Sequence, residues 1–233
     1  MFVIGFPAAA FATNCFIVAP APGEECLIVD PGVGVVDRLR EVLKEHRLRP
    51  AAVLLTHGHL DHVYSITPVC QSHNVAVHIH DDDRYRLHDP IGMMDPALKT
   101  MLESQFGPLP TWSEPDDVIS LPGGGRVDIA GIGLDVLHSP GHTEGSVMFR
   151  VEDVPDAMGR DSGLNRTLFA GDVLFSGGIG RTDLAGGSDD DMTATLRDVV
   201  LGQQDDSLVL PGHGPATTIE RERLTNPYLR GLK

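Results

Sequence analysis

Apolar residues in this chain gather in short segments, most of which end at Gly, Pro, Asp or His. Short apolar runs bounded by such residues and rich in β-branched side chains are typical of strands. The pattern therefore predicts strands at 15–18, 26–29, 53–56, 75–79, 134–137, 146–151, 167–170 and 208–210.

Helical periodicity is clearest over 36–46, where Val36, Leu39, Val42 and Leu43 share one face, and again over 190–201. The stretch 88–117 is less regular, and we interpret it as a short helix at 96–105 packed by its Met and Leu side chains. A mobile cover over a pocket is the alternative. Strands that alternate with helices early and form hairpin-like runs later predict an α/β fold of stacked sheets with outer helices.

The composition fits one soluble domain that spans residues 1–233, with 41% hydrophobic and 22% charged residues. Lys and Arg total 18 against 33 Asp and Glu, a formal net charge of -15. That charge disfavours nucleic acid and anionic membrane surfaces as partners. No apolar run approaches the length of a membrane-spanning helix, and the sequence leaves the oligomeric state open.

Three cysteines, Cys15, Cys26 and Cys70, lack CxxC spacing and are odd in number. They argue against a disulfide framework and favour a cytoplasmic protein. The apolar start of the chain raises the question of a signal peptide, but the first basic residue is Arg38 and Gly5 and Pro7 interrupt the run. We therefore expect no signal peptide.

A dense polar run, Thr56-His57-Gly58-His59-Leu60-Asp61-His62, directly follows the apolar segment 52–55. In an extended chain, side chains two positions apart point the same way, so His57 and His59 can face one metal ion. Asp61 suits the N-cap of a following helix, and a turn there would let Asp61 and His62 approach a second ion. Because four such groups cannot be buried without partners, the run predicts a metal site.

Three later segments share one pattern, in which an apolar strand is followed by small residues and one potential ligand. They are Ser139-Pro140-Gly141-His142-Thr143, Phe169-Ala170-Gly171-Asp172 and Leu210-Pro211-Gly212-His213-Gly214. Glycine allows close backbone approach, so each strand can deliver its ligand into a crowded site. Together with the first run, these segments suit two adjacent divalent ions. Imidazoles and carboxylates without thiolates favour zinc, with iron or manganese as alternatives.

The pattern resembles the metallo-β-lactamase superfamily, whose HxHxDH signature is matched by His57, His59, Asp61 and His62. Later landmarks follow in order up to His213, so the resemblance covers nearly the whole chain. Within the superfamily the chain is most similar to glyoxalase II-like hydrolases, through PGHTEGS at 140–146, GDVLF at 171–175 and GRTDL at 180–184. This resemblance implies a four-layer αβ/βα sandwich of two mixed sheets with outer helices.

The resemblance also implies a role for each ligand. One ion would be bound by His57, His59 and His142, and the other by Asp61, His62 and His213. Asp172 would bridge the two ions, which makes Asp61 and Asp172 the carboxylates expected at the catalytic centre.

Other polar residues near these segments have less certain assignments. Asp30 is expected either to orient a ligand imidazole or only to form the turn before Pro31. Ser139 and Thr143 are further candidates for contacts around His142. His78 and His80 imitate a ligand pair before Asp81-Asp82-Asp83, and we interpret them as a solvated strand end.

The reaction implied by the resemblance is hydrolysis of the thioester of a small 2-hydroxy acid. Twenty residues follow His213, so we expect the chain to lack the C-terminal helical domain with which glyoxalase II holds glutathione. Asp183 stands where that enzyme carries a tyrosine, while Arg181 keeps its basic function. Arg181 is expected to bind a substrate carboxylate, or alternatively to form a surface ion pair with Asp183.

Persulfide dioxygenases of the same superfamily also resemble this sequence, including its GRTD loop at 180–183. Those enzymes use a single iron at the first site, whose ligands are present in either case. The sequence therefore leaves a mononuclear iron dioxygenase open as the alternative to a hydrolase.

Overall fold

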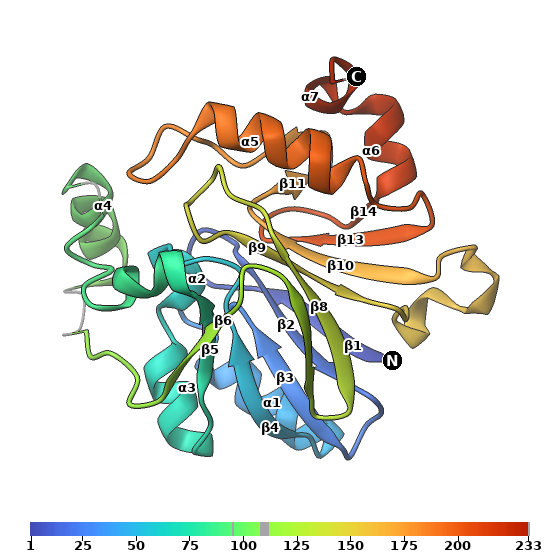
Figure 1. The fold of residues 1–233 in the computed structure, drawn as a ribbon. Helices are drawn as coiled ribbons and strands as arrows, with labels where there is room; N and C mark the ends of the chain where they lie inside the picture. The colour runs from blue at the N-terminus through green and yellow to red at the C-terminus, as the bar shows by residue number, and fades with distance from the viewer. Residues whose placement is uncertain (95, 108–111, 233) are drawn as a thin grey trace.

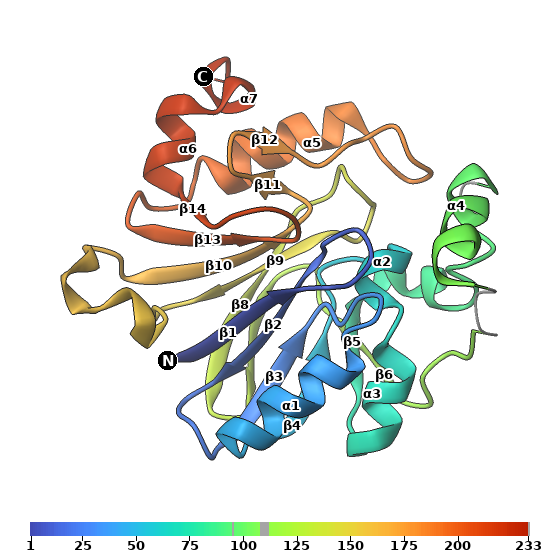
Figure 2. The same ribbon diagram turned by 180° about the vertical axis from the view of Figure 1, so that it is seen from behind.

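The computed structural model describes residues 1–94, 96–107 and 112–232. Within these residues the strands form two mixed six-stranded sheets that pack face to face, with helices on the outer side of each (Figure 1; Figure 2). This arrangement confirms the α/β sandwich expected from the sequence. No helix in these ranges is both long enough and apolar enough to cross a membrane.

Each sheet is built from one half of the chain. The first contains, in spatial order, β1 (Phe2–Pro7), β2 (Asn14–Ala19), β3 (Glu25–Val29), β4 (Arg49–Leu54), β5 (Val77–His80) and β6 (Val118–Leu121). The second contains β14 (Thr217–Thr218), β13 (Ser207–Pro211), β10 (Arg166–Gly171), β9 (Val147–Val151), β8 (Ile132–His138) and β7 (Gly125–Ile129). Strands β3 to β6 pair in parallel, as do β10 and β13, and the other neighbouring strands are antiparallel. A short hairpin joins β11 (Leu174–Phe175) to β12 (Gly178–Ile179).

The helices lie on the outer faces of the sheets or connect their strands. They are α1 (Val36–His46), α2 (Leu60–Val63), α3 (Ile66–His73), α4 (Pro96–Phe106), α5 (Asp189–Thr195), α6 (Ile219–Thr225) and α7 (Pro227–Arg230). A π-helical segment, Leu196–Val200, continues α5, and short 3-10 helices occur at Asp81–Leu87, Asp156–Met158 and Arg160–Ser162. In both views α1 and α3 cover the first sheet, whereas α5 and α6 cover the second (Figure 1; Figure 2).

Alternation of side chains along the strands creates the layers. In β2, Cys15 and Ile17 pack towards α1 and α3, whereas Phe16 and Val18 pack against the second sheet. In β10, Phe169 faces the first sheet while its neighbours face α5 and α6. Since successive strand side chains point to opposite faces, each sheet can bury apolar groups on both sides.

Most of the predicted elements are present. The predicted helix 36–46 is α1, each predicted strand overlaps an observed one, and α4 contains the predicted helix 96–105. Leu102 is buried against Leu60, but Met93 and Met101 are 43% and 41% exposed, so packing of this stretch by its methionines is only partly correct. Residues 95 and 108–111 of the stretch lie outside the described residues.

Candidate metal centre

Seven predicted ligand side chains meet where segments from both sheets come together. The first sheet supplies the segment after β4 and helix α2, and the second supplies the β8–β9 loop and the segments after β10 and β13. Their possible ligand atoms form three overlapping groups, in each of which all atoms lie within 4.8 Å of one another. The groups are His57, His59 and His142; His57, His62 and Asp172; and Asp61, His62 and His213.

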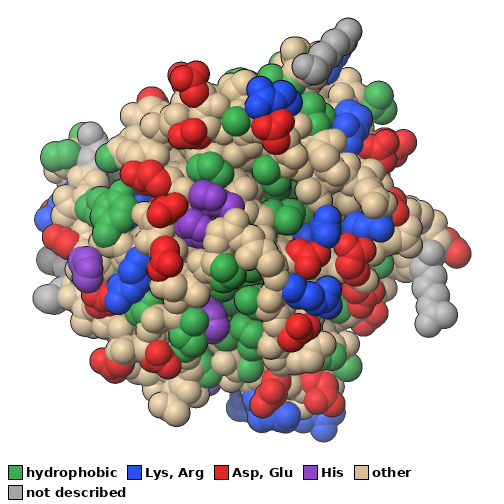
Figure 3. Space-filling view, viewed as in Figure 1, with side chains coloured by type: hydrophobic (Ala, Val, Ile, Leu, Met, Phe, Trp, Pro, Cys, Tyr) green, Lys and Arg blue, Asp and Glu red, His purple; other side chains and the backbone are tan. Residues whose placement is uncertain are grey.

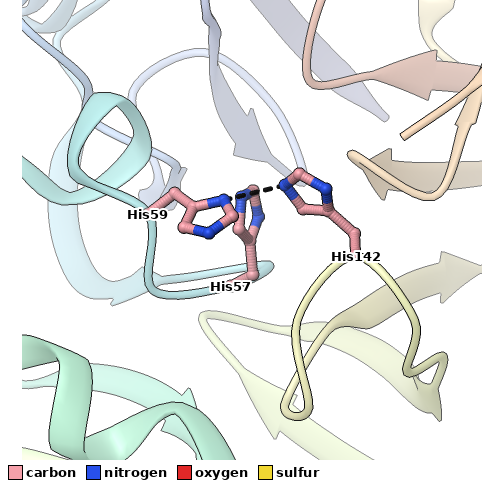
Figure 4. A group of neighbouring side chains, drawn as sticks. All are labelled: His57, His59 and His142. Atoms are coloured by element: carbon pink, nitrogen blue, oxygen red, sulfur yellow. Dashed lines mark hydrogen bonds between the residues drawn. The ribbon is translucent and has the colours of Figure 1, made fainter. Parts of the chain in front are cut away.

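The first group consists of three imidazoles that point towards one another from two loops (Figure 4). His59 Nδ1 and His142 Nε2 are 2.8 Å apart, and the rings of His57, His59 and His142 lie at 79° to 88° to one another. Burial and the neighbouring imidazoles lower the pKa of His57 well below its usual range and that of His59 to about 3. Burial also lowers the pKa of His142. The rings are thus neutral at pH 7, which is the form that binds a metal ion.

The group of Asp61, His62 and His213 combines imidazoles with a carboxylate. Asp61 Oδ2 lies 3.2 Å from His213 Nε2 and 3.6 Å from His62 Nε2. Burial opposes a charge on His62, but the carboxylates of Asp61, Asp172 and Asp30 outweigh it and raise the pKa of His62 well above its usual range. A site that stabilises a proton in this way also stabilises a divalent cation. Asp61 was expected at the N-cap of α2, but the N-cap is His59 and Asp61 lies in the first turn.

Asp172 lies between the group of His57, His59 and His142 and the group of Asp61, His62 and His213. Its Oδ2 is 3.6 Å from His142 Nε2 and 3.5 Å from His213 Nε2, while its Oδ1 is 3.4 Å from His62 Nε2. Although burial opposes ionisation, the neighbouring imidazoles hold the pKa of Asp172 below its usual value. A single carboxylate therefore faces histidines of both groups.

Hydrogen bonds outside the centre fix which imidazole nitrogen faces inward. His62 Nδ1 lies 2.9 Å from Asp30 Oδ2, His142 Nδ1 2.7 Å from the Arg181 carbonyl oxygen, and His213 Nδ1 3.1 Å from the Phe11 carbonyl oxygen. Because these partners accept hydrogen bonds, each Nδ1 donates its proton outward and each Nε2 is the nitrogen that faces the centre. The raised pKa of His62 means that its Nε2 also carries a proton until a metal ion displaces it.

His57 is oriented through a relay of the same kind. The Thr56 hydroxyl donates to Asp30 Oδ2 at 2.6 Å, so it accepts from His57 Nδ1 at 3.1 Å. Asp30 also accepts from the Thr56 backbone N–H and adopts a positive φ of 50°. The expectation that Asp30 contacts a ligand imidazole is therefore met.

Buried polar atoms without hydrogen-bond partners also indicate that these side chains can hold a cation. Within the described residues, the buried side-chain nitrogen and oxygen atoms that lack a hydrogen-bond partner are His57 Nε2, His62 Nε2, Asp172 Oδ1 and Ser207 Oγ. Buried polar atoms without partners are costly, and the first three all face the same point in the fold. A bound metal ion satisfies such atoms.

Glycines permit the close approach of the ligand segments. Gly171 has a φ of +48°, and a Cβ there would lie 2.5 Å from the Thr56 hydroxyl. A Cβ on Gly212 would collide with Asp172 Oδ1 and His62 Cε1. The small residues that precede Asp172 and His213 thus have the steric role predicted from the sequence.

Sequence reasoning missed the importance of Asp83, which is fully buried. Its carboxylate accepts hydrogen bonds from the Gly58 N–H at 2.7 Å, the Gly145 N–H at 2.9 Å and the Thr143 hydroxyl at 2.8 Å. Arg86, which is 3% exposed, donates to it through Nε at 3.1 Å. Asp83 therefore ties the His57–His59 segment to the loop that carries His142.

Two other expectations change. Ser139 bonds the Leu137 carbonyl oxygen rather than a group around His142. The solvated strand end expected for His78 and His80 is wrong for His80, which is 5% exposed. His80 does not pair with His78 but stacks on His138, with ring centroids 4.2 Å apart.

A cavity of about 720 Å³ opens over the centre and is lined in part by His59, Asp61, His142, Asp172 and His213. Figure 3 shows histidine atoms at the surface on this face, with apolar and acidic side chains beside them.

Arg181 also lines the cavity, and its guanidinium forms a two-point ion pair with Asp183 at 2.6 and 2.7 Å. The surface ion pair expected as one alternative is thus present. Binding of a substrate carboxylate by Arg181 stays a prediction.

The chain is similar in sequence to several curated proteins. It is 43% identical to an uncharacterized protein of Mycobacterium tuberculosis (strain H37Rv) over 233 residues, covering 100% of this chain and 99% of that protein. It is 34% identical to Probable metallo-hydrolase YqgX of Bacillus subtilis, covering 90% and 89%. It is 30% identical to Hydroxyacylglutathione hydrolase GloC of Haemophilus influenzae, covering 96% and 95%.

Several solved structures have the same fold as this chain. BLEG-1 B3 metallo-beta-lactamase superposes with a TM-score of 0.76 at 31% identity, covering 98% of this chain and 99% of that one. TTHA1623, in a di-iron-bound form, superposes with a TM-score of 0.75 at 29% identity, covering 97% and 100%. ETHE1 from Myxococcus xanthus, at 21% identity and a TM-score of 0.75, covers 99% and 85% and shows the shared fold.

The family comparison agrees with these likenesses and with the clustered His and Asp side chains. Residues 8–213 match the family described as Metallo-beta-lactamase superfamily. That match spans more than half of the chain and includes every predicted ligand, so this protein belongs to the metallo-β-lactamase superfamily.

Proposed function

We propose that this protein is a hydrolase that uses two divalent ions, with zinc as the first candidate, to cleave the thioester bond of a small 2-hydroxy acid. The observation that carries the proposal is that Asp172 lies 3.6 Å from His142 and 3.5 Å from His213, between two sets of candidate ligands, and that buried atoms of His57, His62 and Asp172 there lack hydrogen-bond partners. Similarity to Hydroxyacylglutathione hydrolase GloC supports the reaction class, and similarity to TTHA1623 in a di-iron-bound form supports two ions.

In this proposal His57, His59 and His142 hold one ion, Asp61, His62 and His213 hold the other, and Asp172 contacts both. Bound there, divalent ions would supply a water of lowered pKa and polarise the substrate carbonyl.

The protein's own groups position these ligands for that chemistry. Asp30 and the carbonyl oxygens of Arg181 and Phe11 accept hydrogen bonds from the Nδ1 atoms of these imidazoles, so Nε2 of each ring is the atom that would bind an ion. Hydrolysis forms one bond between water oxygen and the acyl carbon, breaks the C–S bond, and releases a carboxylic acid and a thiol.

The test uses purified protein whose metals have been quantified, assayed on lactoyl thioesters and, separately, for oxygen uptake with a thiol persulfide. Thioester cleavage with two ions per chain supports the proposal. One iron per chain, persulfide-dependent oxygen uptake and no thioester cleavage would replace it with the dioxygenase alternative.

A further inference from the structure

The cavity over the metal centre has a largely apolar lining away from the ligands. Met93 and Met94 come from the segment before α4, and Leu60 comes from α2. Phe175 in β11 and Leu184 in the loop before α5 line another part. Met93 and Leu184 are 43% and 36% exposed, so a ligand that covers them would remove apolar surface from water.

The charged groups in this lining are already neutralised. Of the described residues around the cavity, the cationic side chains are Arg86 and Arg181. Arg86 is held by Asp83 at 3.1 Å and by Glu144 at 2.6 Å, and Arg181 is held by Asp183 at two points. The carboxylates in the lining, those of Asp61 and Asp172, belong to the ligand groups. Among the described residues of this lining, an anionic substrate half would therefore meet no unpaired Arg side chain.

The cavity is also much larger than a small 2-hydroxyacyl group. A volume of about 720 Å³ corresponds to on the order of 20 groups the size of a water molecule, at roughly 30 Å³ each. A three-carbon acyl group occupies a minor part of that space. The apolar region is therefore available to the larger half of the substrate.

We propose that the thiol half of the substrate is apolar and uncharged, so that the enzyme prefers alkyl thioesters to the thioester of glutathione. This inference rests on the proposed hydrolase function and identifies its substrate class. Glutathione carries carboxylates and amides, and burying them against Met, Leu and Phe side chains without partners is unfavourable. An alkyl chain gains free energy in the same place.

The experiment compares lactoyl thioesters of ethanethiol, butanethiol, octanethiol and glutathione, all below micellar concentrations, with protein of known metal content. We expect kcat/KM to rise with alkyl length, by at most about fourfold per methylene. The octyl thioester should exceed the glutathione thioester by about tenfold or more. Non-hydrolysable thioether analogues of the same thiols provide dissociation constants that do not depend on turnover.

The outcomes separate this inference from the function on which it rests. Equal or faster cleavage of the glutathione thioester overturns the apolar preference and keeps the hydrolase. If metal-loaded protein cleaves none of the thioesters, the hydrolase function fails. Tighter binding of the octyl than of the glutathione thioether then still supports an apolar site, and equal or weaker binding overturns both.

Leu184→Asn tests the lining directly. We expect this substitution to lower kcat/KM for the octyl thioester about fivefold, because part of a leucine contact is lost, and to lower that for the ethyl thioester by a smaller factor. Leu224→Asn is the matched control, since Leu224 is 67% exposed on α6 and lies outside the cavity lining. Equal effects of the two variants on both substrates would contradict the inference.

Asp183→Asn tests the charge balance. This change leaves Arg181 without its carboxylate partner, so a cation becomes available at the cavity rim. We expect kcat/KM for the glutathione thioester to rise about fivefold while that for the butyl thioester stays constant. A glutathione rate that does not change would contradict the role assigned to the paired Arg181.

Discussion

Among the described residues, two clusters of histidine and aspartate lie at strand ends, and the ligand atoms in both are close enough to share a metal ion. His57 and His142 have ring centroids 4.7 Å apart, and His80 and His138 have theirs 4.2 Å apart. Asp82 lies within reach of the second pair, as Asp172 lies near the first. Proximity alone therefore does not distinguish the clusters.

Orientation separates them. The rings of His57 and His142 are at 79°, whereas those of His80 and His138 are stacked at 11°. Stacked rings hold their nitrogens side by side, so their lone pairs run parallel and do not converge on one ion. In the second cluster His138 Nε2 also donates to the Glu144 carbonyl oxygen, and His80 Nδ1 accepts from the Asp82 N–H. We therefore expect ring orientation and the hydrogen-bond partners of each imidazole nitrogen to determine which cluster binds a metal ion.

Removing Asp172 should break the first cluster. We expect Asp172→Ala to lose most bound metal and to lower kcat by more than about a hundredfold, because substitutions of mere outer partners of metal ligands already cost ten- to a hundredfold. Metal analysis and steady-state kinetics on a lactoyl thioester measure both. A variant with two ions per chain and wild-type kcat would refute the assignment of Asp172.

The convergence of the predicted ligands could be predicted from the sequence because their segments have local patterns. Each ligand follows an apolar strand, and small residues such as Gly171 and Gly212 mark where two backbones approach. The layers were predictable for the same reason, since strand alternation and the helix period at 36–46 are local patterns.

Asp83 could not be found in that way. Its partners Gly58 and Gly145 are 25 and 62 residues distant in the sequence, so its burial depends on how the two halves of the chain pack. Strand β1 escaped prediction because Gly5 and Pro7 interrupt its pattern, and its place depends on pairing with β2.

The next prediction concerns Asp83, which connects the His57–His59 segment to the loop that carries His142. Asp83→Asn removes a buried charge that faces Arg86 and should destabilise the protein by about 3 kcal/mol. We expect weaker metal binding as well, since the His57–His59 segment loses its tie to the His142 loop. Urea unfolding and metal titration give the two quantities. Asp82→Asn, whose side chain is 57% exposed, should stay within about 0.5 kcal/mol, and similar losses in both variants would contradict the role of Asp83.

Orientation can be tested without removing a ligand. Thr56→Val deletes the hydroxyl between Asp30 and His57, so His57 Nδ1 loses its acceptor. We expect metal affinity to fall about tenfold, measured by competition with a chelator. Thr167→Val is the matched control, because Thr167 is equally buried and donates to the Asp153 carbonyl oxygen, outside the ligand groups. If both variants bind metal equally well, the relay through Thr56 does not orient His57.

The smallest effect is expected in the second cluster. His80→Ala removes a buried ring that stacks on His138, so we expect a loss of about 1 kcal/mol in the free energy of unfolding. Metal content and kcat should stay near wild type, because the parallel rings do not direct lone pairs at a common point. His57→Ala, which removes a ring of similar burial from the first cluster, should lose bound metal under the same conditions. Loss of metal in the His80 variant would show that stacked imidazoles rearrange to bind an ion, and the distinction between the two clusters by ring orientation would then be wrong.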